Sequence, residues 1–213
     1  MHVDVGVLAL QGAFREHAEA FRELGADVHE VRLPGQLDGL DAIVLPGGES
    51  SVMSKRLVTS GVLEPLRGLL ADGLPALATC AGLVLVAREV LDGVEGQVCL
   101  GLLDAVVRRN AYGSQVASFE APIDVDGLDG GPFTGVFIRA PGITRTGAGV
   151  EVLARLDGDA VAVRQGRVVA TTFHPELSGD RRLHRWFIAE VLHGKVGATP
   201  PGSAPRADAR VRT

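Results

Sequence analysis

The sequence is short of cysteine, of aromatic residues and of net positive charge. Its two cysteines, Cys80 and Cys99, are too few for a disulfide framework, so we expect a reducing compartment in which either thiol can be free. The net charge is −5 at pH 7, with both signs mixed along the chain. This balance gives no indication that the protein binds nucleic acid or an anionic membrane surface.

Long apolar runs are also lacking. No segment approaches the roughly 18 consecutive apolar residues that a membrane-spanning helix needs. The first ten residues, MHVDVGVLAL, contain Asp4 and lack both the basic start and the small-residue cleavage site of a secretory signal. We therefore expect a cytoplasmic protein with no membrane association.

The chain has 213 residues, a length that suits one domain followed by a tail. The expected domain covers residues 1–194. Residues 195–213 are rich in Gly, Pro, Ala and Arg, a composition that buries too little apolar surface to fold, so we expect a disordered tail.

The first hundred residues alternate between strand and helix patterns. Such alternation requires crossover connections and predicts a parallel sheet. The predicted strands cover residues 3–10, 28–33, 42–45 and 76–79, and the predicted helices cover residues 14–24, 50–58, 63–71 and 83–90.

After residue 100 the pattern changes to short strands separated by turn signals such as Asp157-Gly158. We interpret this half as antiparallel strands added to the parallel sheet, followed by an amphipathic helix over residues 180–192. The predicted strands are residues 103–108, 116–123, 135–139, 150–156, 160–164 and 168–173.

A thiol stands where one predicted strand turns into a helix. Residues 75–83 read PALATCAGL, and Cys80 is followed by the small pair Ala81-Gly82, which permits a tight turn. Ligands of open parallel sheets bind at the carboxyl ends of the strands, and a nearby helix N-terminus favours the charged form of a thiol. Cys80 is therefore a candidate nucleophile, although a lone cysteine is more commonly a buried structural residue.

A nucleophilic cysteine needs a base, and one of the six histidines stands at a matching position. His174 follows the strand predicted over residues 168–173 and opens the run His174-Pro175-Glu176. Glu176 could accept a hydrogen bond from the far imidazole nitrogen and orient the ring, as the third member of a triad does. The alternative interpretation is a simple helix start, with Pro175 near its first position.

Residues 46–50, Pro-Gly-Gly-Glu-Ser, follow the predicted strand 42–45. Two consecutive glycines let the backbone approach a ligand closely, and outward-facing amides can hold an oxyanion. An ordinary strand–turn–helix capped by Ser50 is the alternative. Phosphate binding is disfavoured, because no Gly-Lys-Ser/Thr follows and Glu49 would repel an anion. The sequence thus places a thiol, a Gly-Gly loop and a His–carboxylate pair at the ends of predicted strands. This combination predicts a cysteine hydrolase acting on a carbonyl, with neither metal nor cofactor.

Five segments, read in order, resemble the class I glutamine amidotransferase family. TCAGL (79–83) and FHPEL (173–177) are typical of the wider family, whereas LALQGA (8–13), LPGGESS (45–51) and GVFIRAP (135–141) are similar to the glutaminase subunits of pyridoxal 5′-phosphate synthases. The resemblance runs from about residue 3 to residue 193. It implies a three-layer, flavodoxin-like α/β fold with a mixed, mostly parallel sheet and added antiparallel strands.

The resemblance also implies a reaction, the hydrolysis of L-glutamine to glutamate and ammonia through a thioester on Cys80. His174 would act as the base and Glu176 would orient it. The backbone amides of Gly48 and Ala81 would hold the oxyanion. Glutamine binding is implied for Gly48, Glu49, Ser50, Arg109, Ile138 and Arg139.

A partner follows from the chemistry of the product. Ammonia released into neutral water is mostly protonated and is then no longer a nucleophile, so a glutaminase that feeds a synthesis must deliver it inside a complex. The resemblance implies a hetero-oligomer with a (β/α)₈-barrel pyridoxal 5′-phosphate synthase subunit, with Gln11 near the interface. We expect the site of the isolated chain to be poorly organised.

Three other functions remain compatible with these residues. A glutaminase serving another synthase, such as that of the histidine pathway, would share the triad, although LALQGA and GGESS speak against it. A non-catalytic relative on the same fold need not keep both His174 and Glu176. A general cysteine peptidase or esterase would hydrolyse its substrates without dependence on glutamine.

Overall fold

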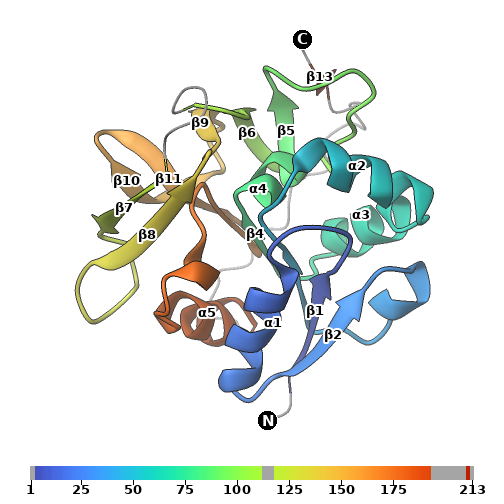
Figure 1. Cartoon of the computed structure of the whole chain (residues 1–213), viewed down its shortest axis with the longest axis horizontal. Coiled ribbons are helices and arrows are strands. Elements are labelled where there is room, and N and C mark those ends of the chain that lie inside the picture. Colours follow the sequence, from blue (N-terminus) through green and yellow to red (C-terminus); the bar gives the residue numbers. More distant parts are fainter. Residues whose placement is uncertain (1–2, 112–117, 193–209, 212–213) are drawn as a thin grey trace.

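A seven-stranded sheet forms the centre of the structure, a computed structural model that describes residues 3–111, 118–192 and 210–211 (Figure 1). Five neighbouring strands run parallel in the order β12-β4-β3-β1-β2, and β11 and β10 extend the sheet, each antiparallel to its neighbour. The predicted mixed, mostly parallel sheet is confirmed. Its strands are β1 (Asp4–Leu8), β2 (Asp27–Val31), β3 (Ala42–Leu45), β4 (Ala76–Thr79), β10 (Glu151–Leu156), β11 (Asp159–Gln165) and β12 (Val168–Thr171).

Helices cover both faces of this sheet and complete three layers (Figure 1). The first and last helices, α1 and α5, lie together on one face, and α2, α3 and α4 lie on the other. Their bounds are α1 (Phe14–Glu23), α2 (Ser50–Thr59), α3 (Leu63–Ala71), α4 (Ala81–Val86) and α5 (Arg182–Trp186), with short helices η1 (Pro34–Leu37), η2 (Pro175–Leu177) and η3 (Phe187–Leu192), the last a π-helical continuation of α5.

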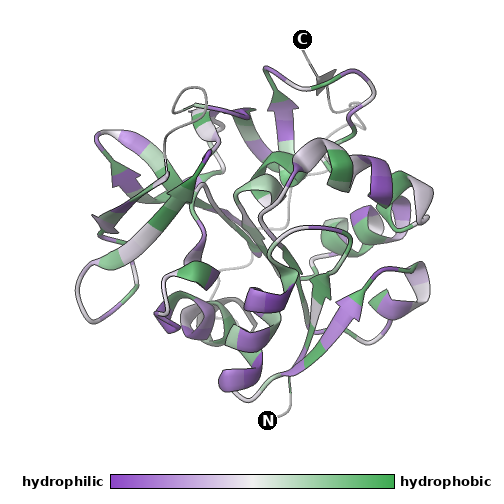
Figure 2. Ribbon diagram, viewed as in Figure 1, coloured by the Kyte–Doolittle hydropathy of each residue, from purple (hydrophilic) through white to green (hydrophobic). Residues whose placement is uncertain are grey.

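The core consists of two apolar clusters, one on each face of the main sheet. Phe21 and Phe187 belong to the cluster under α1 and α5, whereas Met53 and Leu57 belong to the cluster under α2 and α3. Figure 2 shows the central strands as hydrophobic and the outward helix surfaces as hydrophilic. Because both faces of the central strands are covered, β3 and β4 read as continuous apolar runs, and their bounds match the predicted ones.

The predicted antiparallel addition is confirmed for β10 and β11, but three other strands predicted in the second half of the chain belong to other sheets, so their assignment to the main sheet was wrong. β5 (Ala87–Val90), β6 (Leu103–Arg108), β9 (Gly142–Thr146) and β13 (Arg210–Val211) form a second sheet, and β7 (Ser118–Ile123) pairs with β8 (Phe133–Ile138) in a separate hairpin. β12 is parallel to β4. The residue pattern of a strand shows which of its faces is buried but not which strand it pairs with, and pairing depends on long-range contacts.

The predicted helix over residues 83–90 is wrong in its second half. α4 ends at Val86, and Ala87–Val90 is β5, which pairs in parallel with β6. Ala87 and Val90 are buried while Arg88 points to solvent. A short valine-rich run is compatible with either structure, and pairing with β6 decides for the strand.

Most of the predicted tail, residues 195–213, lies outside the described residues, as do residues 116–117 of a predicted strand. Arg210–Val211, inside that tail, form β13 beside β5. In the part of the chain that the structure describes, no helix has the length and apolar character needed to cross a bilayer.

Candidate active site

Three segments meet at the carboxyl ends of β3, β4 and β12. Leu45 is in register with Ala78, and Thr79 is in register with Thr171, so the chain leaves the sheet at three adjacent points. The backbone N–H of Cys80 donates to the Thr171 carbonyl at 2.8 Å and closes this edge. The sheet therefore brings together the thiol, the Gly-Gly loop and the His-Pro-Glu run that the sequence placed at strand ends.

Cys80 occupies a strained turn between β4 and α4. Its φ of 49° and ψ of −103° lie in a region that residues other than glycine rarely adopt. The next turn is equally tight, because a Cβ on Gly82 would collide with the Leu45 carbonyl oxygen. Glycine at this position lets α4 begin directly against the end of β3, with Cys80 at the junction and 6% exposed.

His174 lies between Cys80 and Glu176. Its Nδ1 atom is 2.7 Å from Glu176 Oε1, and its ring is also hydrogen-bonded to the Cys80 thiol. With Nδ1 engaged by the carboxylate, Nε2 is the nitrogen available to the sulfur. His174 and Glu176 are only 7% and 4% exposed, so these hydrogen bonds form away from bulk water.

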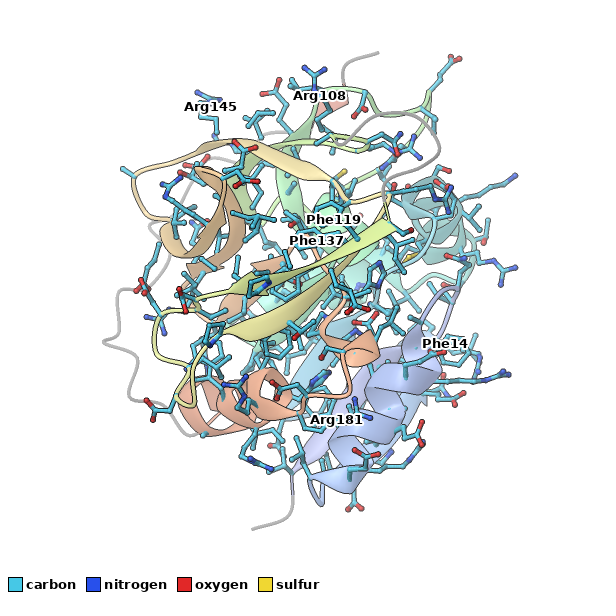
Figure 3. All side chains as sticks on the ribbon, turned by 60° about the vertical axis from the view of Figure 1, so that its left-hand side comes forward. Phe14, Arg108, Phe119, Phe137, Arg145 and Arg181 are labelled. Atoms are coloured by element: carbon cyan, nitrogen blue, oxygen red, sulfur yellow. The ribbon has the colours of Figure 1, made fainter. Side chains whose placement is uncertain are left out.

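The hairpin β7–β8 supports His174 from one side. The His174 N–H donates to the Val136 carbonyl of β8 at 2.8 Å. Phe137 of β8 stacks on Phe119 of β7 and also contacts Phe173, the residue before His174. Figure 3 shows Phe119 and Phe137 together on this hairpin. The aromatic contacts fix the strand end from which the imidazole projects.

The electrostatics of this cluster favour a protonated imidazole beside an ionised carboxylate. Burial alone would lower the pKa of His174, but hydrogen bonds with Cys80 and Glu176 and the charge of Glu176 raise it to about 10. Burial alone would raise the pKa of Glu176, but its contacts with the rings of His17 and His174 hold it well below its usual range. His174 can therefore take a proton from the thiol and keep it as an imidazolium.

The Gly-Gly loop is held between His174 and the segment after β1. A Cβ on Gly47 would collide with the His174 ring, so a glycine is required there. The Gly47 carbonyl accepts the Ala13 N–H at 3.0 Å, and the Glu49 N–H donates to Gln11 Oε1 at 2.7 Å. The Gly47 carbonyl and the Gly48 N–H belong to one planar trans peptide and point in opposite directions. The Gly48 N–H therefore points away from Ala13.

Two residues predicted to bind glutamine contact each other. Arg109 Nη2 donates to Glu49 Oε1 at 2.6 Å, with the arginine side chain 15% and the glutamate side chain 40% exposed. Glu49 also accepts the Ser51 N–H at 3.4 Å and is the residue that caps α2, so the alternative in which Ser50 is the cap is wrong. Ser50 is instead the buried first residue of α2 and lies 3.5 Å from the side-chain nitrogen of Gln97.

The remaining predicted residues lie on adjacent backbone. Ile138 ends β8 and is half-buried, and Arg139 is exposed with a φ of 45°. The Ala111 N–H donates to the Ala140 carbonyl at 3.2 Å, so the segment after β8 is joined to the chain just beyond Arg109. Ala81 is the first residue of α4, where a backbone N–H lacks a partner within the helix.

One residue that sequence reasoning did not assign to the site also contacts it. His17 of α1 is fully buried, with Nε2 3.1 Å from Glu176 Oε2 and 3.0 Å from Thr79 Oγ1. The sequence feature that could have indicated its burial is its position, because His17 falls on the apolar face of the helix between Phe14 and Phe21. In the described part of the chain, no group of three His, Cys, Asp or Glu side chains is arranged to hold a metal ion.

Comparison with known families decides the classification. The model of the SNO glutamine amidotransferase family matches residues 7–193. The chain belongs to the SNO glutamine amidotransferase family. The resemblance drawn from the five sequence segments is thereby confirmed, and the match to this family covers every residue of the candidate site described above.

Similar proteins in the family match over nearly their whole length. A protein of Parafrankia sp. (strain EAN1pec) is 54% identical over 91% of this chain and 95% of its own, and one of Mycobacterium avium (strain 104) is 57% identical over 90% and 98%. Both are named pyridoxal 5′-phosphate synthase subunit PdxT. A crystal structure described as a glutamine amidotransferase matches with a TM-score of 0.83 and 50% identity, over 89% of this chain and 99% of its own. The predicted fold class is confirmed.

Proposed function

We propose that this protein is the glutaminase subunit of a pyridoxal 5′-phosphate synthase and hydrolyses L-glutamine to glutamate and ammonia for vitamin B6 synthesis. The names of relatives that are 54% and 57% identical support the pathway. The observation that carries the chemistry is the hydrogen-bonded series Cys80, His174 and Glu176 at one edge of the sheet. The chemistry needs no metal or cofactor.

In the first half of the reaction, Cys80 Sγ attacks the side-chain amide carbon of glutamine. His174 accepts the thiol proton and donates it to the amide nitrogen as the C–N bond breaks. Ammonia leaves, and a glutamyl thioester remains on the sulfur. Glu176 holds the ring by Nδ1 and stabilises its imidazolium form.

In the second half, water attacks the thioester carbon. His174 takes a proton from the water and returns one to Cys80 Sγ, so glutamate is released and the thiol is restored. In both halves the carbonyl oxygen becomes an oxyanion, which the amides of Gly48 and Ala81 would stabilise.

Glu49 and Arg109 would recognise the amino-acid end of glutamine. A carboxylate suits the substrate ammonium, and a guanidinium suits the substrate carboxylate. Without substrate the two side chains bond each other at 2.6 Å. Bound glutamine would separate them and exchange one ion pair for two, with Ser50, Ile138 and Arg139 completing the site.

The partner would be a (β/α)₈-barrel synthase subunit that receives the ammonia. Gln11 and Ala13 each hydrogen-bond the 47–49 loop, so a partner that touched this segment would move that loop directly. We expect Gln11→Ala to lower partner-stimulated activity. If complex formation and stimulated activity were untouched, Gln11 would have no place at the interface.

Two further assignments complete the proposal. Residues 1–194 would form the glutaminase domain, in keeping with the family match over residues 7–193. The protein would work in the cytoplasm, where both of its unpaired cysteines, Cys80 and Cys99, stay reduced.

The test is glutamate release from L-glutamine by the purified chain, alone and with its barrel subunit. We expect low activity alone and a large rise with the partner. High activity of the isolated chain would keep the chemistry but remove the gating by the partner. A folded chain with no activity in either assay would point to a non-catalytic relative, and hydrolysis of peptides or esters without glutamine dependence would point to a general cysteine hydrolase.

A further inference from the structure

Glu176 receives one histidine on each of its two carboxylate oxygens. His174 Nδ1 lies 2.7 Å from Oε1, and His17 Nε2 lies 3.1 Å from Oε2. Apart from the contact with His17, Oε2 has no hydrogen-bond partner among the residues that the structure describes. Because a buried carboxylate oxygen without a polar neighbour is costly, the contact of Oε2 with His17 contributes, together with His174, to keeping Glu176 ionised.

A second buried histidine determines which ring nitrogen of His17 carries the proton. His184 of α5 has its Nε2 atom 3.1 Å from His17 Nδ1, while its own Nδ1 is buried without a partner among the described residues. A buried N–H without an acceptor is rarer than an acceptor without a donor, so the His184 proton belongs on Nε2. His184 then donates to His17 Nδ1, and the proton of His17 is left on Nε2, where it faces Glu176 and Thr79.

His17 also joins three separate elements. It projects from α1, its partner Thr79 ends β4 directly before Cys80, and Glu176 lies in η2. A second, outer contact joins two of these elements, α1 and η2, because Arg181 pairs with Glu23 of α1 at 2.6 Å and donates to the Glu176 carbonyl at 3.3 Å. Figure 3 shows Arg181 beside α1. The outer contact is made with the backbone of Glu176, whereas its carboxylate contacts His17 and His174 and, within the described residues, no other polar side chain.

We propose that His17 is a positioning residue of the hydrolase, which holds the Glu176 carboxylate against His174 and so keeps the imidazole aligned with Cys80. The role rests on the function proposed above. Among the described residues, the charged or titratable groups that face the Glu176 carboxylate are His17 from α1, His174 from the loop before η2, and His184 from α5, while Arg181 contacts the Glu176 backbone carbonyl. Burial lowers the pKa of His184 to about 3, so it supplies a hydrogen bond and no charge.

Two amide substitutions separate the two ends of the His17 ring. The side-chain nitrogen of glutamine reaches the position of Nε2, whereas asparagine reaches only the position of Nδ1. His17→Gln therefore keeps a donor to Glu176, and His17→Asn keeps only the contact with His184. Phe21→Leu is the matched control, because Phe21 is fully buried on the same helix, contacts His184 edge-on and has no polar atom that could bond Glu176.

The variants are assayed in the Cys99→Ala background, with the barrel subunit present for kinetics. We expect His17→Asn to lower kcat at least about 10-fold with KM changed less than about 2-fold, and His17→Gln to restore kcat to within about 3-fold. The alkylation rate of Cys80 by iodoacetamide, followed against pH without glutamine, should move to higher pH in His17→Asn alone. This shift is expected because a misaligned His174 no longer stabilises the thiolate.

Three results would overturn the proposal. Equal kcat values and alkylation profiles for the asparagine and glutamine variants would show that Nε2 is not needed. An equal loss in Phe21→Leu would mean that His17 only supports packing. A wild-type kcat in folded His17→Asn would remove the role altogether. If wild-type protein did not hydrolyse glutamine, the proposed function would fail. The alkylation profiles would still show whether His17 affects the reactivity of Cys80 through Glu176 and His174.

Discussion

The two cysteines are almost equally buried, yet they stand in opposite surroundings. Cys80 is 6% exposed and Cys99 is 3% exposed. Cys80 has a strained backbone and a hydrogen bond to His174, whereas Cys99 lies between β5 and β6 in the apolar cluster under α2 and α3. Burial raises the pKa of the Cys99 thiol to about 11, and the nearby Arg67 guanidinium only partly opposes this rise. Exposure therefore does not distinguish a nucleophile from a structural thiol, and the polar neighbours do.

The two cysteines also differ in what they require of the surrounding structure. Cys99 needs only apolar volume around it, and its backbone carbonyl is bonded by Arg67 at 3.0 Å. Cys80 needs a positive φ, a glycine at position 82 and a buried His–carboxylate pair that loops from distant parts of the chain hold in place. Strain and buried charge of this kind persist only where the surrounding structure supports them, and they gather at functional sites.

The largest expected effect is the loss of the nucleophile. Cys80→Ala should lower glutamate release at least about 1,000-fold, since no other group can form the thioester. The matched Cys99→Ala should keep activity to within about 2-fold. Glutaminase assays with the barrel subunit, together with circular dichroism of both variants, measure this contrast. Equal activity losses in two folded variants would contradict the assignment of roles.

A methyl group at position 82 should displace the backbone that positions Cys80. Gly82→Ala places a Cβ against the Leu45 carbonyl oxygen, so α4 and Cys80 must shift. We expect a loss of about 2–3 kcal/mol in unfolding free energy and of at least about 100-fold in kcat. Urea unfolding and steady-state kinetics measure the two effects.

The control for this substitution is Gly68→Ala in α3. A Cβ at Gly68 meets no atom within 4 Å, so this change should raise stability by about 0.5–1 kcal/mol and leave kcat unaltered. A Gly82→Ala protein as stable and active as the Gly68→Ala protein would show that the tight turn into α4 is not required.

The sequence allowed the ends of the central strands to be predicted, but not the contacts between distant elements. Ala42–Leu45 and Ala76–Thr79 are apolar runs ended by recognisable turns, so the positions of Cys80 and His174 at strand ends could be derived from residue patterns. His17 and His184 are 167 residues apart, and no local pattern indicates that they meet. The strand β5 was missed for the same reason, because its partner β6 is a separate segment.

The deprotonation of His174 and that of Cys99 should lower the unfolding free energy in two different pH ranges. The pKa of His174 is raised from 6.5 to about 10, so its contribution to stability is complete below pH 6.5 and is lost as the pH rises toward 10. The raised pKa of Cys99 causes a further loss only above about pH 9, where the thiol ionises in the unfolded chain but not in the folded one.

The measurement is the unfolding free energy in urea from pH 6 to pH 11. His174→Gln should flatten the decline between about pH 6.5 and 9, and Cys99→Ala should flatten it only above about pH 9. If His174→Gln left the lower part of the curve unchanged, His174 would not be held protonated by Cys80 and Glu176.

The smallest expected effect is on packing around Cys99. Cys99→Ala removes one sulfur atom from an apolar cluster and should cost about 1 kcal/mol in unfolding free energy. Cys99→Ser should cost about 1–2 kcal/mol more, because it buries a hydroxyl that needs a hydrogen bond. Urea unfolding at pH 7 measures both differences. Were the serine variant as stable as the wild type, the surroundings of Cys99 would be polar enough to hold a hydroxyl, and the contrast with Cys80 would then rest on His174 and Glu176 alone.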